Sequence, residues 1–528
     1  TTEFFLFLCN PINLDSVMNL GKLTNELQFF YNIFMNKITV NNYDLDEEQL
    51  KPILENAKYS LIIAGAGSGK TLTLIGKIKY LLENNLFKPE EICTISFTNE
   101  ATNNLKKNIL KNCGLEVPTF TFHKLALDIL KRAQIHYTIA TPDLLEFTAD
   151  EFFQTKCFGN NFLAKKCYKI FDIPSFFSWE KILKSNKYSG IKKQVLTFIN
   201  LFKANGYFQN DLKEILKGAQ KEPLLYIIYA IYLFYESNKE SSGTLDFDDI
   251  ILKATSYLRE HECSLPYKLL IIDEFQDTSL CRFQFVEEIL KQTDASLCVV
   301  GDDYQSIYHF SGCDLTIFLN FSSYFPKVKI YKLETTYRNS DELIKSAGNF
   351  IQKNPNQIKK ELKSSKHLSK PIKLIYYKNK DSILEKVLKR IPEDQEIFLL
   401  GRNHFDLKKY TKNLTYSLKE NNELVFAKFP NHKIRFLTVH AAKGLESDVV
   451  ILLNLENSLY GFPTLLKDEK VLSLIKKVQP YPYEEERRLF YVALTRTKSF
   501  IYLLVPKYMP SCFIKEIKKD KNVENLFL

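Results

Sequence analysis

Arginine is scarce in this chain. Only ten of the 528 residues are arginine, and the net charge of +10 comes mainly from lysine. Lysine occurs together with many Asn, Ile, Phe and Tyr residues, a composition typical of AT-rich coding. That bias accounts for the lysine excess as readily as a polyanionic partner does. Each arginine is therefore more informative about function than the abundant lysines.

The chain also lacks paired cysteine motifs and long apolar runs. Its ten cysteines include no Cys-x-x-Cys pair, and Cys93 and Cys298 fall in apolar segments. This pattern argues against a disulfide or zinc framework and indicates buried thiols in a reducing cytosol. No apolar run approaches the length of a membrane span. The apolar start Thr1–Cys9 is short and has no basic lead-in, so we expect a packed strand there, no signal peptide, and a cytoplasmic protein without membrane contact.

The remaining composition is that of a globular protein, with 45% hydrophobic and 25% charged residues. The length predicts two to four domains. Charge is distributed unevenly, because residues 150–220 hold twelve lysines against six acidic residues. This segment favours a polyanionic partner.

Short apolar strands alternate with amphipathic helices in two series, which predicts two α/β lobes with parallel sheets. Ligands of such sheets gather at the carboxyl ends of the strands. The predicted strands are Ser60–Ala64, Ile92–Phe97, Leu269–Asp273 and Leu297–Gly301 in the first series, and Lys329–Leu333, Ile372–Tyr377, Glu396–Leu400, Arg435–Val439, Val449–Leu455 and Phe500–Val505 in the second.

A glycine-rich turn follows the first strand and ends in Gly-Lys-Thr. Its small residues allow backbone N–H groups to point at phosphate oxygens, Lys70 can reach the β- and γ-phosphates, and the Thr71 hydroxyl can bind Mg²⁺. The helix predicted from Lys70 to Asn84 offers its positive end to the same anion. The strict pattern has Gly where Ala64 stands. The predicted nucleotide loop comprises Ala64, Gly65, Ala66, Gly67, Ser68, Gly69, Lys70 and Thr71.

Two adjacent carboxylates, Asp273 and Glu274, end another apolar strand. Asp273 can hold the water shell of Mg²⁺, and Glu274 can orient and deprotonate an attacking water. Such a pair is common on protein surfaces, but together with the phosphate loop it predicts an ATP hydrolase that uses Mg²⁺.

A longer series of motifs makes the chain resemble superfamily 1 DNA helicases of the Rep/UvrD type, and most of all their helicase IV-like members. The resemblance covers roughly residues 45–506 and is highly specific. Its motifs are Gln49, 64–71, 96–101, 121–123, 245–249, 273–277, 301–308, 336–338, 438–446, 485–488 and 491–496.

The resemblance implies two RecA-like P-loop lobes with ATP between them. We expect an N-terminal extension of unknown role at 1–44, a first ATP-binding lobe at 45–123 and 245–328, a helical insertion at 124–244, and a second lobe at 329–528. Rep/UvrD-type enzymes carry a large accessory domain within the second lobe. Here about thirty residues remain, near 403–434, too few for an independent domain.

The resemblance also implies roles around the nucleotide. Gln49 would read the adenine edge, Tyr337 would stack on the base, and Glu446 would hold the ribose. The residues expected at the phosphates and in catalysis are Glu274, Lys70, Gln305 as the γ-phosphate sensor, and the arginines Arg338 and Arg496 from the second lobe.

A second set of residues would bind a single strand of DNA, with aromatic faces on the bases and polar groups on the backbone. Its members are Phe97, Thr98, Asn99, His123, Tyr308, Phe310, Thr438 and His440. The alternative for Phe97 and Phe310 is a place in the core. The insertion segment that contains Trp179 and Lys192 has the same two alternatives: it lines the path of the DNA, or its aromatic residues form the core of the insertion.

The resulting hypothesis is an ATP- and Mg²⁺-dependent helicase that moves on single-stranded DNA, 3′ to 5′ by resemblance, and acts at junctions of single and double strands. One alternative is a DNA-stimulated ATPase subunit of a repair or defence complex with a protein partner and little unwinding activity alone. Another is a nucleotide-switched binding module, and an RNA substrate also stays open.

Overall fold

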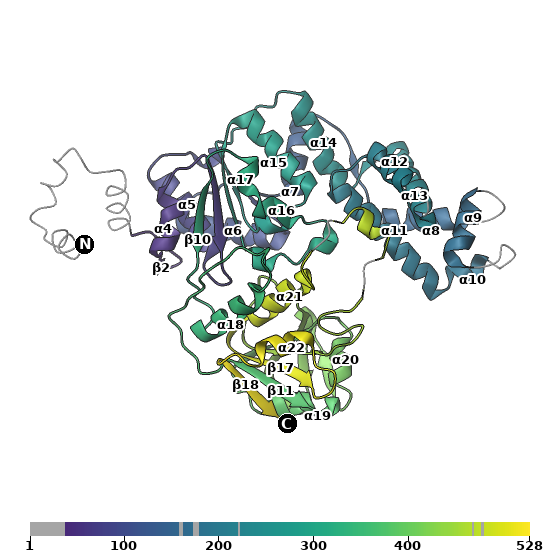
Figure 1. The fold of residues 1–528 in the computed structure, drawn as a ribbon. Coiled ribbons are helices and arrows are strands. Elements are labelled where there is room, and N and C mark those ends of the chain that lie inside the picture. Colours follow the sequence, from purple (N-terminus) through teal and green to yellow (C-terminus); the bar gives the residue numbers. More distant parts are fainter. Residues whose placement is uncertain (1–36, 158–161, 173–178, 220–221, 467–468, 477–479) are drawn as a thin grey trace, which may run out of the picture.

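The computed structural model describes residues 37–157, 162–172, 179–219, 222–466, 469–476 and 480–528 (Figure 1). The apolar start and most of the expected N-terminal extension lie outside these residues. The described end of that extension is a small antiparallel hairpin of β1 (Thr39–Val40) and β2 (Tyr43–Asp44). The predicted pair of α/β lobes with parallel sheets is confirmed.

The first lobe is built on a six-stranded sheet in which all neighbouring strands are parallel. Its four central strands are almost entirely buried, as expected for a parallel sheet covered on both faces. The strand order is β10 (Lys329–Leu333), β3 (Tyr59–Ala64), β9 (Ser296–Gly301), β8 (Leu269–Ile272), β4 (Ile92–Ser96) and β5 (Thr119–Thr121).

One strand belongs to a different sheet from the one the sequence predicted. We expected Lys329–Leu333 to open the second lobe after residue 328, but as β10 it pairs with β3 at the edge of the first sheet, with Leu333 opposite Ala64. Its mostly exposed edge position explains the error, because chain order alone does not determine which sheet an edge strand joins.

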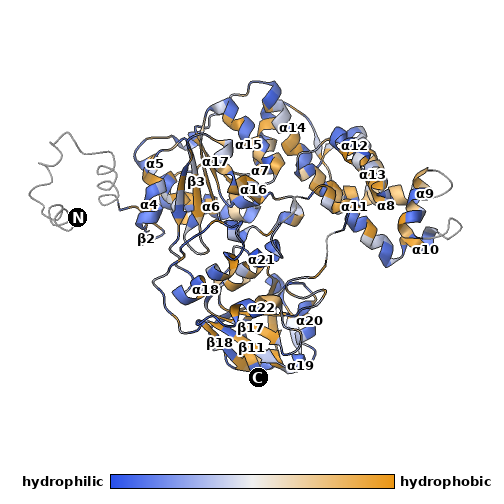
Figure 2. Cartoon of the chain, in the orientation of Figure 1, coloured by the Kyte–Doolittle hydropathy of each residue, from blue (hydrophilic) through white to orange (hydrophobic). Residues whose placement is uncertain are grey.

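Helices cover both faces of the first sheet. One face packs on α4 (Glu47–Leu54), α5 (Lys70–Glu83) and α6 (Asn99–Cys113), and the other packs on α7 (Phe122–Arg132), α14 (Phe247–Glu260) and α15 (Leu280–Thr293). Figure 2 shows the hydrophobic strands enclosed by helices with hydrophilic outer surfaces. This layering leaves the carboxyl ends of the strands open toward the second lobe.

Between α7 and α14 the chain leaves the sheet and forms a separate helical body, the insertion. Its helices are α8 (Leu144–Thr155), α9 (Phe162–Phe171), α10 (Trp179–Leu183), α11 (Asn186–Ala204), α12 (Gln209–Gly218) and α13 (Pro223–Ser242). Trp179 packs edge-on against Phe171 and donates its indole N–H to the carbonyl of Phe153 at 2.8 Å. Lys192 pairs with Glu146 at 2.8 Å. The core alternative thus holds for Trp179, while the aromatic residues before it lie outside the described residues.

The second lobe is an eight-stranded sheet. Its order is β13 (Tyr416–Leu418), β14 (Glu423–Phe426), β15 (Phe429–Thr438), β12 (Glu396–Gly401), β16 (Ser447–Leu452), β17 (Thr497–Pro506), β11 (Ile372–Tyr377) and β18 (Val523–Phe527). The strands from β15 to β18 are parallel, while β13 and β14 are antiparallel additions. Residues 403–434 therefore mostly extend this sheet.

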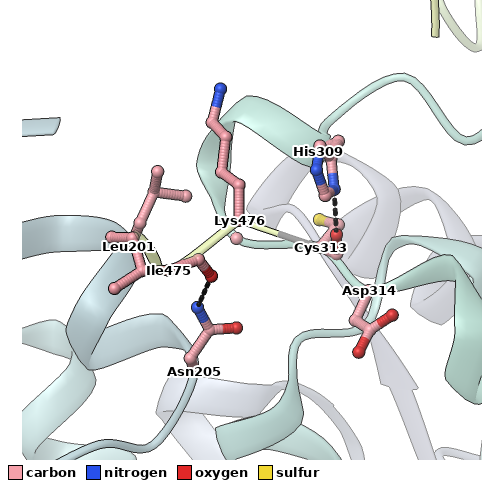
Figure 3. A pocket seen from close by; sticks show the side chains of 8 residues that line it. Leu201, Asn205, His309, Cys313, Asp314, Ile475 and Lys476 are labelled. Carbon is pink, nitrogen blue, oxygen red and sulfur yellow. Dashed lines mark hydrogen bonds between the residues drawn. The ribbon is translucent and has the colours of Figure 1, made fainter. Parts of the chain in front are cut away.

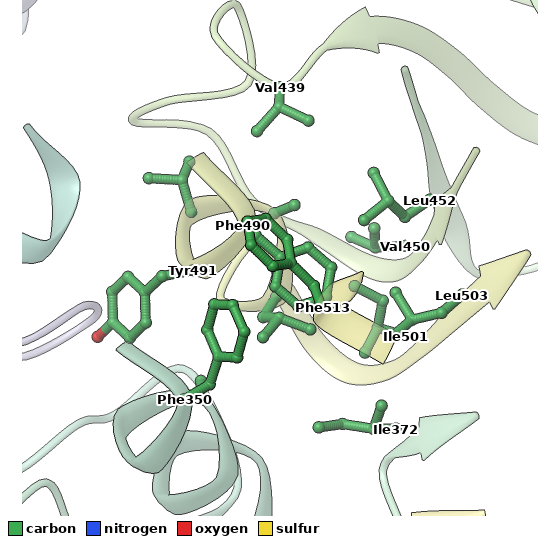
Figure 4. Close-up of a cluster of buried hydrophobic side chains, with 14 of the residues drawn as sticks. Phe350, Ile372, Val439, Val450, Leu452, Phe490, Tyr491, Ile501, Leu503 and Phe513 are labelled. Atoms are coloured by element: carbon green, nitrogen blue, oxygen red, sulfur yellow. The ribbon is translucent and has the colours of Figure 1, made fainter. Parts of the chain in front are cut away.

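Alternate residues of the second sheet face two apolar cores. One core, drawn in Figure 4, places Leu452 and Leu503 against aromatic residues of α18 (Asp341–Ile351), α21 (Glu484–Leu494) and α22 (Cys512–Ile517). The other lies under α19 (Lys380–Leu388) and α20 (Asp406–Tyr410). Burial on both faces fixes the strand register.

A segment of the second lobe reaches the insertion. Val471, Leu472 and Ile475, which lie between β16 and α21, are buried in the apolar core of the insertion. Asn205, directly after α11, donates to the carbonyl of Ile475 at 3.4 Å (Figure 3). The insertion is consequently attached to both lobes.

Among the described residues, no helix combines the length and apolar character needed to cross a bilayer. The nine cysteines in this part of the chain are unpaired thiols.

Candidate active site

A cavity of about 440 Å³ lies at the carboxyl ends of the first-sheet strands, where the second lobe covers them. Its lining comes from both halves of the chain. The glycine-rich turn and the carboxylate pair contribute from the first lobe, whereas Arg338, Lys443 and Arg496 contribute from the rest of the chain. The groups expected at the phosphates, among them Lys70, Glu274 and Arg496, therefore border one space.

The glycine-rich turn connects β3 directly to α5. Gly67 and Gly69 adopt left-handed backbone conformations, with φ of 73° and 80°, which side chains rarely tolerate. A Cβ atom on Gly67 would also lie 2.6 Å from Cβ of Arg338. Ala64, by contrast, is the last residue of β3 and sits in extended structure. Its methyl group is compatible with the loop, which explains the departure from the strict pattern.

Lys70 lies next to the carboxylate pair. The Lys70 ammonium donates to Glu274 Oε1 at 2.6 Å. Burial raises the pKa of Glu274, but Lys70 and Lys443 outweigh it and lower that pKa to about 2. Burial and the adjacent Glu274 raise the pKa of Asp273 to about 6. Glu274 has a left-handed φ of 52°, a strained conformation typical of functional residues.

Gln305 and Arg496 meet across the cleft. Arg496 Nη2 donates to Gln305 Oε1 at 3.0 Å, and Gln305 Nε2 donates to Asp302 at 2.5 Å. Burial and the nearby Arg338 lower the pKa of Arg496 to about 9. The two arginines therefore lie close enough to interact, and both line the same cavity as Lys70, where two positive charges suit a polyphosphate.

The residues expected around adenine and ribose do not line this cavity but contact residues that do. Gln49 is buried in the first turn of α4, and its amide donates to the carbonyl of Ser68 at 3.2 Å. The Tyr337 hydroxyl donates to the carboxylate of Asp46, and its ring is 43% exposed. Glu446 accepts from Arg338 Nε at 2.6 Å. All three are thus brought to the nucleotide loop or to the arginine beside it.

Only part of the set expected to bind DNA lies at this cavity. Phe97, Thr98 and Tyr308 line the nucleotide cavity itself. Phe97 is half-buried and packs edge-on against Phe122, so it also belongs to the first-lobe core. Asn99 and Thr98 are exposed where α6 begins.

Phe310 and His440 form a second group. Their rings meet edge-on at 5.5 Å, and the Phe310 ring is 50% exposed, so the core alternative does not apply to Phe310. The Tyr308 hydroxyl donates to the carbonyl of His440 at 3.4 Å. Thr438 is buried at the end of β15, where its hydroxyl accepts the N–H of Ala441.

Two histidines of this set are neutral groups. Burial and the charge of Arg282 lower the pKa of His123 to about 4, and burial together with Arg402 lowers the pKa of His440 to about 4. His123 packs against Phe247 at 5.3 Å. These side chains offer hydrogen bonds, and not positive charge, near pH 7.

Sequence comparison identifies the family. Residues 45–326 match the UvrD/REP helicase N-terminal domain, and residues 405–508 match the UvrD-like helicase C-terminal domain. The chain belongs to the UvrD/REP helicase family. It is 27% identical to DNA helicase IV of Escherichia coli (strain K12) over 91% of this chain and 71% of that protein. It is 26% identical to ATP-dependent DNA helicase Rep of Buchnera aphidicola subsp. Schizaphis graminum over 88% and 70%, and 28% identical to Rep of Escherichia coli over 62% and 46%.

The structure adds residues of this UvrD/REP helicase that sequence reasoning did not assign. Lys443 donates to the buried carboxylate of Asp277 and, at 2.8 Å, to the carbonyl of Gln305. Its ammonium lies 4.0 Å from Glu274. Both Lys443 and Asp277 fall inside quoted motifs, but only their contact across the lobes reveals a shared role.

Lys360 is a second unassigned residue. Its side chain is fully buried with those of Asp302 and Asp303, at 2.5 and 2.7 Å. It also donates to the carbonyl of Ala64 at 3.0 Å. Nothing in the sequence around Lys360 predicts that its side chain is buried. The Asp302-Asp303 pair after a buried strand does predict a nearby cation, because buried charges need a partner.

Proposed function

We propose that this UvrD/REP helicase hydrolyses ATP in the cleft between its two sheets and uses the reaction to move along single-stranded DNA. As a member of that family the chain is a DNA helicase. The observation that carries the proposal is the shared cavity, which is lined by Lys70 of the first lobe together with Arg338 and Arg496 from the second half of the chain. Groups on opposite walls of a cleft can hold a triphosphate only when the walls close on it, which ties the chemistry to motion.

Each residue has a distinct part in hydrolysis. The backbone N–H groups of the nucleotide loop and Lys70 bind the phosphates. Glu274, ionised at any physiological pH because its pKa is about 2, accepts a hydrogen bond from the attacking water and takes its proton. Arg338 and Arg496 stabilise the charge that develops on the transferred phosphoryl group.

Mg²⁺ would be held by the Thr71 hydroxyl and the Asp273 carboxylate. The Asp273 carboxylate is buried, and its pKa is raised by that burial and by the adjacent Glu274, so a neighbouring cation would stabilise its ionised form. When bound, the ion neutralises phosphate charge.

Coupling to DNA would use residues that belong to both sites. Tyr308 follows Gln305 by three residues and contacts the carbonyl of His440. Lys443 follows His440 by three residues and contacts Gln305. A strand bound at Phe310, His440 and Tyr308 would therefore alter the position of Gln305 and of the arginine that it contacts.

The substrate would be single-stranded DNA next to a duplex, with movement 3′ to 5′, and we place the reaction in the cytoplasm, where thiols stay reduced. The competing hypothesis is a DNA-stimulated ATPase that needs a protein partner to unwind. It is favoured by the small size of the element at residues 403–434, which holds one short helix and two antiparallel strands.

The experiment measures ATP hydrolysis by the full chain with single-stranded DNA, duplex DNA and RNA, followed by strand displacement on 3′- and 5′-tailed duplexes. We expect stimulation by single-stranded DNA and displacement of the 3′-tailed substrate. Stimulation without displacement supports the partner-dependent alternative. Hydrolysis that does not respond to any nucleic acid overturns the proposal.

A further inference from the structure

The first turn of α4 carries two neighbouring glutamates in different surroundings. Glu47 is exposed and pairs with Lys51 one turn further on, at 2.8 Å. The Glu48 side chain is only 22% exposed and points at the segment that follows β10. Its Oε2 accepts the backbone N–H groups of Glu334 at 2.8 Å and Thr335 at 3.0 Å. One carboxylate oxygen therefore holds two consecutive residues of the chain that leads to the second lobe.

The opposite side of this segment is held as well. Lys363 lies 2.8 Å from Glu48 Oε1, its N–H donates to the carbonyl of Glu334 at 3.0 Å, and its carbonyl accepts the N–H of Thr336 at 2.8 Å. The three residues after β10 are thus enclosed between the Glu48 carboxylate and the Lys363 backbone.

From there the segment runs directly along the nucleotide loop. The Thr336 hydroxyl donates to the carbonyl of Ala66 at 2.7 Å, and the N–H of Tyr337 donates to the carbonyl of Gly67 at 2.9 Å. The next residue is Arg338. Thr335, Thr336 and Tyr337 each have a backbone or hydroxyl contact that holds the chain. These contacts position the backbone of Arg338, while its guanidinium is held by Glu446.

The same helix turn also holds the side chains at the base end of the site. Asp46 caps α4 and accepts the hydroxyl of Tyr337, while Gln49 Oε1 accepts the N–H of Asp46 at 3.1 Å. Glu48 stands between these two residues in the chain. The turn thus binds both the ring that faces the base and the backbone that carries the arginine.

We propose that Glu48 is a positioning residue that fixes the connection between the lobes, so that Tyr337 and Arg338 are in place when ATP enters. This inference rests on the proposed ATP hydrolysis. Glu48 does not line the nucleotide cavity; it would act through the N–H groups of Glu334 and Thr335. Because Lys70 and the loop bind the phosphates independently of Arg338, loss of Glu48 acts mainly on the transition state.

The test compares Glu48→Gln with Glu47→Gln in the full chain. The two variants make the same chemical change one residue apart in the same helix turn, so propensity and net charge are matched. Three quantities are measured: hydrogen exchange at the amides of Glu334 and Thr335, the kcat and KM of DNA-stimulated ATP hydrolysis, and the thermal unfolding midpoint. We expect faster exchange and an about tenfold lower kcat in Glu48→Gln, a smaller change in KM, and an unchanged unfolding midpoint. Glu47→Gln should match the wild-type protein.

Three outcomes overturn the inference: unchanged exchange in Glu48→Gln, faster exchange with wild-type kcat, or a loss of kcat that only follows a lower unfolding midpoint. The exchange measurement does not need a working enzyme. A wild-type chain that fails to hydrolyse ATP would therefore overturn the proposed function, while unchanged exchange would overturn the role of Glu48 alone.

Discussion

The Lys70 ammonium and the Glu274 carboxylate are direct partners, 2.6 Å apart. The group proposed to grip phosphate is thus paired with the group proposed to activate water. On the proposed mechanism, a phosphate at the loop would compete with Glu274 for the same ammonium and would leave the carboxylate available to water. The pair would then link nucleotide binding to readiness for hydrolysis.

We expect Glu274→Gln to abolish hydrolysis while ATP binding persists, because the change removes the proton acceptor and leaves the phosphate loop intact. Lys70→Ala should abolish hydrolysis and also weaken binding, because it removes a phosphate ligand. The measurements are steady-state turnover and equilibrium binding of a fluorescent ATP analogue. Glu90→Gln, at an exposed carboxylate before β4, serves as the control, and substantial turnover by Glu274→Gln would refute the assignment of the base.

Lys443 and Asp277 should show strong energetic coupling. They form a buried ion pair across the cleft, and each would be left uncompensated by loss of the other. We expect Lys443→Met and Asp277→Asn each to lower kcat at least tenfold, and the double variant to lose much less than the product of the two, with a coupling energy of about 1–3 kcal/mol. A double-mutant cycle on ATP hydrolysis measures this coupling. Independent effects would show that the pair has no joint role in turnover.

The sequence was sufficient to predict the positions of most strands and of the glycine-rich turn, because both depend on local pattern. Apolar runs of five or six residues located β3, β8 and β9 to within two residues. The glycines of the turn after β3 indicate a phosphate-binding loop. The positions of Asp273 and Glu274 could be predicted because they come directly after the apolar strand β8.

Local sequence patterns do not predict contacts between residues far apart in the chain. The edge strand β10 was assigned to the wrong sheet, because its pairing with β3 is decided by the fold of both lobes. Lys360 has a charged side chain that is fully buried, which only its two aspartate neighbours make tolerable. Phe97 combines core packing with a place on the cavity wall, and its sequence context indicated the two as alternatives.

Phe310→Ala should weaken the response to DNA and spare basal hydrolysis. An exposed aromatic ring beside the cleft offers a stacking surface worth about 1–3 kcal/mol per base, so the DNA concentration for half-maximal stimulation should rise about tenfold. Phe208→Ala is the matched control, because Phe208 is similarly exposed but lies on the insertion. A salt series should accompany both, since phosphate contacts weaken as salt rises. Equal effects of the two substitutions would remove Phe310 from the strand path.

Acid should destabilise the fold partly through His123 and His440. Each has its pKa lowered from the usual 6.5 to about 4 in the folded protein. The unfolded chain therefore binds more protons between these values, and stability that is fully present above pH 6.5 is lost as the pH falls toward 4. His440→Gln should lose less thermal stability between about pH 7.5 and pH 5 than the wild-type protein. The midpoint of thermal unfolding at both pH values measures this, and an equal loss in the variant would contradict it.

The anchoring of Val471, Leu472 and Ile475 in the core of the insertion has a mechanical consequence. The insertion is covalently continuous with the first lobe and packs by apolar side chains against a segment of the second, so it links the two lobes. A rotation of one sheet relative to the other must therefore either move the insertion together with the second lobe or expose these three side chains to solvent.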